Sequence, residues 1–330
     1  MSESVQNVVG AVAKIPAWYQ RAIDFNREDG EVLVDGCRIH YAVWDEHSGE
    51  MADKPGVILV HGSNAHLEWW RFVAPFLADQ FRVVTIDLSG NGDSGWREVY
   101  SGELFAREVK AVCESASLGN KPFVVGHSFG GYVSLETGFH FGEELGGIIF
   151  GDFTVRPPES YTEWGKRIEE RGPAKPMRVY DDLNIALGRF RLMPEQPCQH
   201  PYVISYVGQQ SLHEVEGGWT WKFDPALFDH MEMGSAQAEK FLRLKCRNAL
   251  LLGEYSQDDG ARSAPYMREI TGGLLPVFSI PETYHHFMFD EPMATVASIK
   301  AILLEWIRQD RAEEMRDKMD SILSALNGKG

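Results

Sequence analysis

The chain has 330 residues, 44% of them hydrophobic, and its formal net charge is −16. The length and apolar content allow a large core in one or two domains. A surface this acidic argues against nucleic acid or an anionic membrane as the main partner.

The four cysteines are widely spaced and form no CxxC pair. This pattern favours reduced, mostly buried thiols over a zinc site or a disulfide framework. We therefore expect no metal and no cofactor. No segment has the pattern of a signal peptide, and no apolar run reaches the roughly 18 residues that a membrane span needs. A cytoplasmic location without a membrane span is expected.

Residues 1–30 are predicted to form a helical leader. Val5, Val8, Val9 and Val12 recur at helical spacing. Because the segment is not strongly basic, we expect it to dock on its own domain rather than on a membrane or a partner.

Strand and helix patterns alternate through residues 31–152, which are predicted to form the first part of an α/β core. Gly36 joins two strand patterns in what should be a hairpin. Continuous apolar runs then predict further strands, a pattern typical of a parallel sheet with both faces covered. The expected strands are 31–35, 37–44, 56–60, 81–86, 122–126 and 146–151, with helical stretches near 66–78, 103–117 and 129–141.

The alternation stops over residues 153–233, where prolines and aromatic residues accumulate. We interpret this segment as an inserted, mainly helical cap. The alternation resumes over residues 234–330, which are predicted to complete the core. There the expected elements are a first helix, a strand at 248–252, a helix near 263–271, a strand at 274–280 and a long C-terminal helix from 293.

The strongest motif is Gly126-His127-Ser128-Phe129-Gly130, a G-x-S-x-G sequence between a strand and a helical stretch. That context predicts a sharp, strained strand-to-helix turn with an exposed serine hydroxyl. The turn sets Ser128 at a helix N-terminus, where free N–H groups and the helix dipole face a developing oxyanion. Ser128 is the candidate nucleophile.

With this motif the chain resembles the α/β-hydrolase superfamily over residues from roughly 31 to 310. The resemblance implies an α/β-hydrolase fold with a mostly parallel central sheet and helices on both faces. His61-Gly62-Ser63 follows a strand and matches the family turn that completes the oxyanion hole. The resemblance therefore implies the N–H groups of Ser63 and Phe129 as the oxyanion donors.

Residues 90–95 read GNGDSG, which matches the G-x-G-x-x-G of dinucleotide sites. Such a site needs a helix to begin at once, and here the helical pattern begins only near 103. The longer string DLSGNGDSG looks like a turn of the hydrolase family. We interpret it as structural.

Two histidines, His285 and His286, compete for the role of general base after the last strand. The family often places an acid five residues and a proline seven residues after this base. His285 fits both, with Asp290 and Pro292. We prefer His285 as the residue that takes the Ser128 proton and returns it to the leaving group.

The acid that orients the imidazole has two candidates. Most family members keep it after the strand that precedes the last one, but there Gln257 follows Ser256 and Asp258 lies one position further on. Other members keep it after the strand that follows the nucleophile helix, where Asp152 stands. Asp152 is preferred, and Asp258 is the alternative.

These residues together predict a serine hydrolase that cleaves a small-molecule ester with a hydrophobic part. A thioesterase, a lactonase and a carbon–carbon bond hydrolase use the same triad and stay open, as does a non-catalytic binding protein. Epoxide hydrolases and dehalogenases fit poorly, because they use aspartate where this chain has Ser128. The sequence leaves open whether the protein is a monomer or a homodimer.

Overall fold

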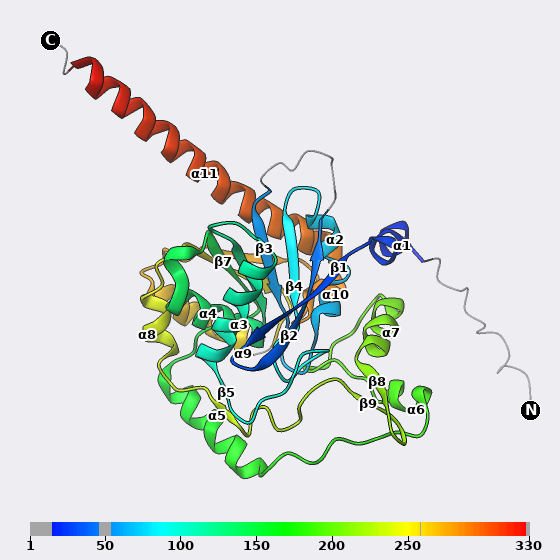
Figure 1. The fold of residues 1–330 in the computed structure, drawn as a ribbon. Coiled ribbons are helices and arrows are strands. Elements are labelled where there is room, and N and C mark those ends of the chain that lie inside the picture. Colours follow the sequence, from blue (N-terminus) through cyan, green and yellow to red (C-terminus); the bar gives the residue numbers. More distant parts are fainter. Residues whose placement is uncertain (1–14, 46–53, 258, 328–330) are drawn as a thin grey trace, which may run out of the picture.

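The computed structural model describes residues 15–45, 54–257 and 259–327. Its centre is an eight-stranded sheet in the order β1-β2-β4-β3-β6-β7-β11-β12 (Figure 1). β1 and β2 form an antiparallel hairpin, β2 and β4 are antiparallel, and every other neighbouring pair in this sheet is parallel. The strands are β1 Glu28–Val34, β2 Cys37–Trp44, β3 Gly56–Val60, β4 Arg82–Ile86, β6 Phe123–His127, β7 Gly147–Gly151, β11 Asn248–Gly253 and β12 Val277–Ile280. The predicted hairpin and mostly parallel sheet are confirmed.

The apolar runs of the sequence bury both faces of this sheet. All five residues of β3 are buried. Val57 and Leu59 belong to one hydrophobic cluster, whereas Ile58 and Val60 belong to another. Because successive side chains of a strand point to opposite faces, a continuous apolar run supplies two cores at once.

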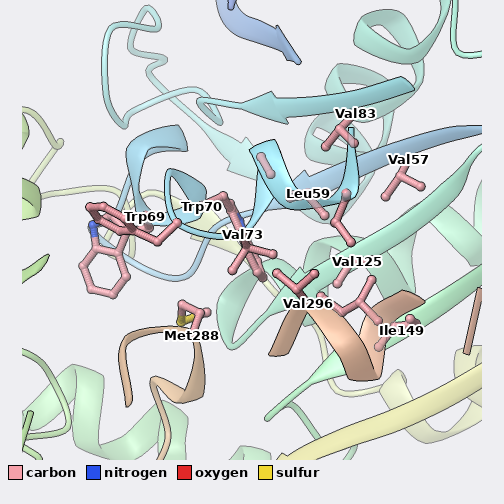
Figure 2. Close-up of a cluster of buried hydrophobic side chains, with 14 of the residues drawn as sticks. Val57, Leu59, Trp69, Trp70, Val73, Val83, Val125, Ile149, Met288 and Val296 are labelled. Carbon is pink, nitrogen blue, oxygen red and sulfur yellow. The ribbon is translucent and has the colours of Figure 1, made fainter. Parts of the chain in front are cut away.

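One core lies under the long C-terminal helix. Figure 2 shows Leu59 and Val125 from the sheet beside Trp70 and Val296 from the covering helices. The elements on this face are η1 Leu67–Trp70, α2 Ala74–Leu77, α10 Phe287–Asp290 and α11 Pro292–Asn327. The helical stretch expected near 66–78 consists of two short helices, η1 and α2. Pro75 lies in the first turn of α2, where its missing N–H costs nothing, so a new helix starts there.

The opposite face of the sheet is covered by a second group of helices, one of which begins directly after the candidate nucleophile. They are α3 Gly102–Ser115, α4 Phe129–Phe141, η2 Gly142–Glu144, α8 Gln237–Leu242 and α9 Asp259–Ile270. The Ser101 hydroxyl caps α3 by accepting the Leu104 N–H at 3.2 Å. α4 begins directly after β6, so the two elements meet at residue 128.

Residues 153–233 contain helices and also a strand hairpin. The elements are α5 Pro158–Arg171, α6 Leu183–Leu187, α7 Pro201–Gln210, β8 Leu212–Val215, β9 Gly218–Trp221 and β10 Met231–Glu232, which pairs with β5 Tyr100–Ser101. The aromatic side chains here mostly pack: Tyr180 and Trp221 lie in a local cluster, and Tyr202 and Tyr206 lie against the core under α11. The hairpin and this packing account for much of the aromatic content noted in the sequence.

Helix α1, Ala17–Asp24, packs on the body of the protein. Tyr19 stacks on Phe72, with ring centroids 5.0 Å apart, and meets Tyr202 edge-on at 4.9 Å. The valines that predicted a longer leader helix lie outside the described residues. At the other end of the chain, Figure 1 shows α11 extending away from the sheet. Among the described residues, no helix is both long enough and apolar enough to cross a bilayer.

Candidate active site

Ser128 lies in a strained turn between β6 and α4. Its φ is 54° and its ψ −118°, a conformation that L-residues rarely adopt. Its N–H donates to the Gly151 carbonyl at 2.8 Å. A Cβ on Gly126 would clash with the Gly130 carbonyl, and one on Gly130 would clash with the carbonyl of Val60. Glycine at both positions therefore lets the strand, the turn and the helix pass at this close range.

Asp152 lies beside Ser128 because of the strand register. β6 and β7 are parallel neighbours, and His127 pairs with Gly151. Ser128 and Asp152 are the residues that directly follow these two strands. Asp152 also has a positive φ, 44°, and its N–H donates to the Leu251 carbonyl at 2.8 Å. The side chain is buried at the carboxyl edge of the sheet, where ligands of open α/β sheets bind.

The Asp152 carboxylate is joined to the His285 ring. Oδ2 lies 2.5 Å from His285 Nδ1 and accepts the Ser256 hydroxyl at 2.6 Å. Oδ1 accepts the Gly253 N–H at 3.3 Å. Because an ionised carboxylate only accepts, Nδ1 carries the proton and Nε2 keeps its lone pair. His285 is thus held in the tautomer that a general base requires.

The alternative acid, Asp258, lies outside the described residues. The preceding residue, Gln257, is exposed. Ser256, two positions before Asp258, turns back to donate to Asp152. The loop after β11 therefore contributes a hydroxyl to the pair formed by Asp152 and His285.

The loop that carries His285 is fastened on both sides by Asp290 and a glutamine from the segment 153–233. Asp290 Oδ2 accepts the Tyr284 N–H at 2.8 Å. Gln196 Nε2 donates to both Asp290 oxygens at 2.9 Å, and Gln196 Oε1 accepts the His286 N–H at 2.8 Å. Burial raises the pKa of Asp290. These bonds fix the backbone on each side of His285.

His286, the second candidate base, faces away from Asp152 and toward aromatic side chains. Its ring centroid is 5.3 Å from that of Trp69 and 6.1 Å from that of Phe289. Burial holds the pKa of His286 well below its usual value, and the neighbouring His285 acts in the same direction. Of the two candidate bases, His285 is the one hydrogen-bonded to Asp152.

The turn after β3 packs directly on the nucleophile. A Cβ on Gly62 would lie 3.3 Å from Ser128 Cβ. The Leu88 N–H donates to His61 Nε2 at 3.1 Å, so His61 Nδ1 carries the proton and donates to the Gly62 carbonyl at 2.7 Å. This fixed turn holds Gly62 against Ser128, and Ser63 is the next residue in the chain. Phe129 opens α4, so no helix carbonyl can accept its N–H.

The loop 87–95 forms a turn held by Asp87. Its Oδ1 accepts the Leu67 N–H at 2.7 Å, and its Oδ2 accepts the Asp93 N–H at 2.9 Å and lies 2.8 Å from His40 Nδ1. These bonds, together with burial of the Asp87 side chain, agree with a structural role.

Two parts of this arrangement escaped sequence reasoning. Gln196 carries no motif and reaches Asp290 over 94 residues of chain. No motif gave Ser256 a role, although it lies on the loop after β11, where most family members keep the acid.

A model of the alpha/beta hydrolase family matches residues 57–299. The chain belongs to this family. A search of curated proteins finds no match. Solved structures share the alpha/beta hydrolase fold at low sequence identity, so they support the fold and leave the substrate open.

Three such structures span most of this alpha/beta hydrolase. E-2-(acetamidomethylene)succinate hydrolase has a TM-score of 0.68 and 17% identity, and the match covers 84% of this chain and 98% of that one. The thioesterase domain from the curacin biosynthetic pathway has a TM-score of 0.66 and 18% identity, covering 84% and 99%. The esterase Rv0045c from Mycobacterium tuberculosis has a TM-score of 0.63 and 19% identity, covering 87% and 96%.

Proposed function

We propose that this alpha/beta hydrolase is a serine carboxylesterase with Ser128 as nucleophile, His285 as general base and Asp152 as the acid that orients it. One observation carries the proposal. The buried Asp152–His285 pair, 2.5 Å between Oδ2 and Nδ1, stands one register step from a serine in a strained turn.

The reaction uses each of these groups in turn. His285 Nε2 takes the proton as Ser128 Oγ attacks the ester carbonyl. The oxyanion receives the N–H groups of Ser63 and Phe129. His285 then gives its proton to the departing alcohol, and water activated by the same nitrogen releases the acid from Ser128.

The buried position of Asp152 suits this role. Its three hydrogen-bond donors hold the carboxylate in place against Nδ1, so it stabilises the imidazolium that forms in each half of the reaction. The side chain does not need to take the proton itself.

The segment 153–233 supplies a wall beside the histidine loop, and we infer that it acts as a cap. Gln196 borders a hollow of about 450 Å³ on this segment, lined by apolar side chains such as Phe190 and Leu192 and by the charged Arg191 and Glu195. The aromatic side chains of the segment 153–233 favour an ester with a hydrophobic part. Thioesters and lactones are the alternatives, since they undergo the same acyl transfer.

The test combines covalent labelling with turnover. A fluorophosphonate should label the native protein but not Ser128→Ala, while Ser256→Ala, which removes the other hydroxyl near Asp152, should still label. Ser128→Ala should lower hydrolysis of p-nitrophenyl esters by at least about 10³-fold. Activity within tenfold of the unchanged protein would exclude the assignment. A panel of esters of graded acyl length, an acyl thioester and a lactone then separates the substrate classes.

A further inference from the structure

Three buried histidines lie close together, and the proposed reaction uses only one of them. His127, His285 and His286 each offer one ring nitrogen, and these nitrogens lie within 4.8 Å of one another. The exposed fractions of the three residues are 1%, 3% and 3%. Their ring centroids are 4.7 to 5.4 Å apart.

Two of the three rings have lone pairs fixed by their hydrogen bonds. His127 Nε2 lies 2.8 Å from the His285 carbonyl, which only accepts, so Nε2 carries the proton. The lone pair of the neutral ring is then on Nδ1. That Nδ1 has no hydrogen-bond partner among the described residues. His285 keeps its lone pair on Nε2 because Nδ1 donates to Asp152.

His286 completes the set. Neither ring nitrogen makes a well-formed hydrogen bond within the described part of the chain. The Met193 and Pro194 carbonyls act on the ring without forming a well-formed hydrogen bond to it. Buried side-chain nitrogens normally have partners, so unused nitrogens on two touching rings call for an explanation.

We propose that His127, His285 and His286 bind a Zn²⁺ ion and that this binding inhibits the enzyme. Neutral imidazole nitrogens are preferred zinc ligands, and three of them leave the fourth tetrahedral position open. Zn–N bonds of about 2.0–2.1 Å place tetrahedral nitrogens roughly 3.3 Å apart. The three nitrogens lie within 4.8 Å of one another, so binding would draw the rings closer together. The His286 ring makes no well-formed hydrogen bond among the described residues, so its movement breaks none.

The surroundings of the cluster also match those of zinc ligands. A histidine that binds zinc usually donates its other N–H to a carboxylate or a backbone carbonyl, which fixes the ring. His285 donates to the Asp152 carboxylate and His127 to the His285 carbonyl. Two of the three ligands thus already have the outer partners that zinc sites use.

Inhibition follows from which nitrogen the metal takes. Zn²⁺ on His285 Nε2 occupies the lone pair that would accept the Ser128 proton. The inhibitory effect rests on the proposed function, whereas binding of the ion does not. Because protons compete for the same nitrogens, affinity for Zn²⁺ should fall as the pH is lowered.

Calorimetric titration of the metal-free, full-length protein with ZnCl₂ tests the binding. We expect one site per chain, and at least tenfold weaker binding in His286→Asn and in His286→Phe. The second variant suits the aromatic surroundings of this ring and guards against misfolding of the first. His40→Asn is the control, since His40, Asp87 and Asp93 form the other metal-compatible group among the described residues.

Ester hydrolysis gives the second measurement. Zn²⁺ should inhibit the unchanged protein reversibly, with recovery after EDTA. The concentration for half-inhibition, relative to the metal-free rate of each variant, should rise at least tenfold in the His286 variants. Absence of Zn²⁺ binding, full affinity in both His286 variants, loss of binding only in His40→Asn, or activation by Zn²⁺ would each overturn the proposal. Zn²⁺ binding that depends on His286 in a protein without esterase activity would uphold the metal site and contradict the proposed function.

Discussion

Gln196 and Asp290 are hydrogen-bonded to each other, and they join the segment 153–233 to the loop that carries His285. The Gln196 amide donates to both Asp290 oxygens at 2.9 Å, while its own carbonyl accepts the His286 N–H at 2.8 Å. Asp290 in turn accepts the Tyr284 N–H. A residue without any catalytic motif thus holds the histidine loop from a distant part of the chain.

Gln196→Ala should therefore disturb catalysis without touching the reacting atoms. Removal of the amide frees the loop on both sides of His285, and small displacements of a catalytic group are costly. We expect kcat to fall about tenfold or more, with a smaller change in KM. Steady-state kinetics on p-nitrophenyl esters measures both.

The neighbouring Glu195 provides a control, because it is exposed and makes none of these bonds. Glu195→Gln should leave kcat unchanged. Gln196→Glu places a second carboxylate against Asp290 and should impair kcat at high pH, with partial recovery as the pH falls and the two acids share a proton. Equal kcat values for Gln196→Ala and Glu195→Gln would refute the positioning role.

The two candidate acids can be separated by matched substitutions. Asp152→Asn keeps the shape of the side chain but replaces the acceptor that fixes the His285 tautomer, so kcat should fall by about 10³–10⁴-fold. Asp258→Asn should stay within tenfold of the unchanged protein. A larger loss in Asp258→Asn would transfer the role to the loop after β11.

The sequence could not decide between these acids because their strands are neighbours. β7 and β11 pair in parallel, so the loops that follow them reach the same region of the sheet edge. Which acid orients His285 depends on packing across several elements, and local sequence patterns do not encode that packing. Ser256, from the loop after β11, already bonds to Asp152.

Local patterns predicted the sheet and the turn at Ser128 well. Apolar runs mark buried strands directly, and Gly126 and Gly130 are required by backbone contacts that any such turn makes. Features that depend on distant contacts were missed. Gln196 contacts a loop 94 residues away, and the hairpin of β8 and β9 lies in a segment whose prolines and aromatics predicted helices.

Low pH should destabilise the fold, because buried neutral histidines take up protons more readily in the unfolded chain. Burial lowers the pKa of His66 to about 3 and lowers those of His127 and His286 as well. In the unfolded chain each titrates near 6.5, so below that pH the unfolded state binds more protons than the folded state. Stability is fully present above about pH 6.5 and is lost as the pH falls, by up to about 1.4 kcal/mol per pH unit for each group.

His66 allows this linkage to be measured at one residue. Urea unfolding gives the free energy of unfolding of His66→Gln at each pH between 7 and 5. The slope of this free energy against pH should correspond to up to one proton fewer than in the unchanged protein. The hydroxyl of Ser211 lies 2.8 Å from His66 Nε2. Ser211→Ala removes the same hydrogen bond but keeps the imidazole, and it should lower stability without reducing the slope. An unchanged slope in His66→Gln would contradict the account.

The strained turn at Ser128 should depend on glycine at position 126. A methyl group there meets the Gly130 carbonyl, and neither backbone can move without disturbing the turn. Gly126→Ala should lower the free energy of unfolding by about 1–3 kcal/mol or more and reduce ester hydrolysis.

Gly142→Ala is the matched control, because its added methyl finds its nearest neighbour, Lys245 N, at 3.4 Å. Gly142 also has a helical φ of −58°, so alanine there should be neutral or stabilising by about 0.4–1 kcal/mol. Urea midpoints measured on both variants decide the matter, and equal midpoints would show that the turn tolerates a side chain at 126.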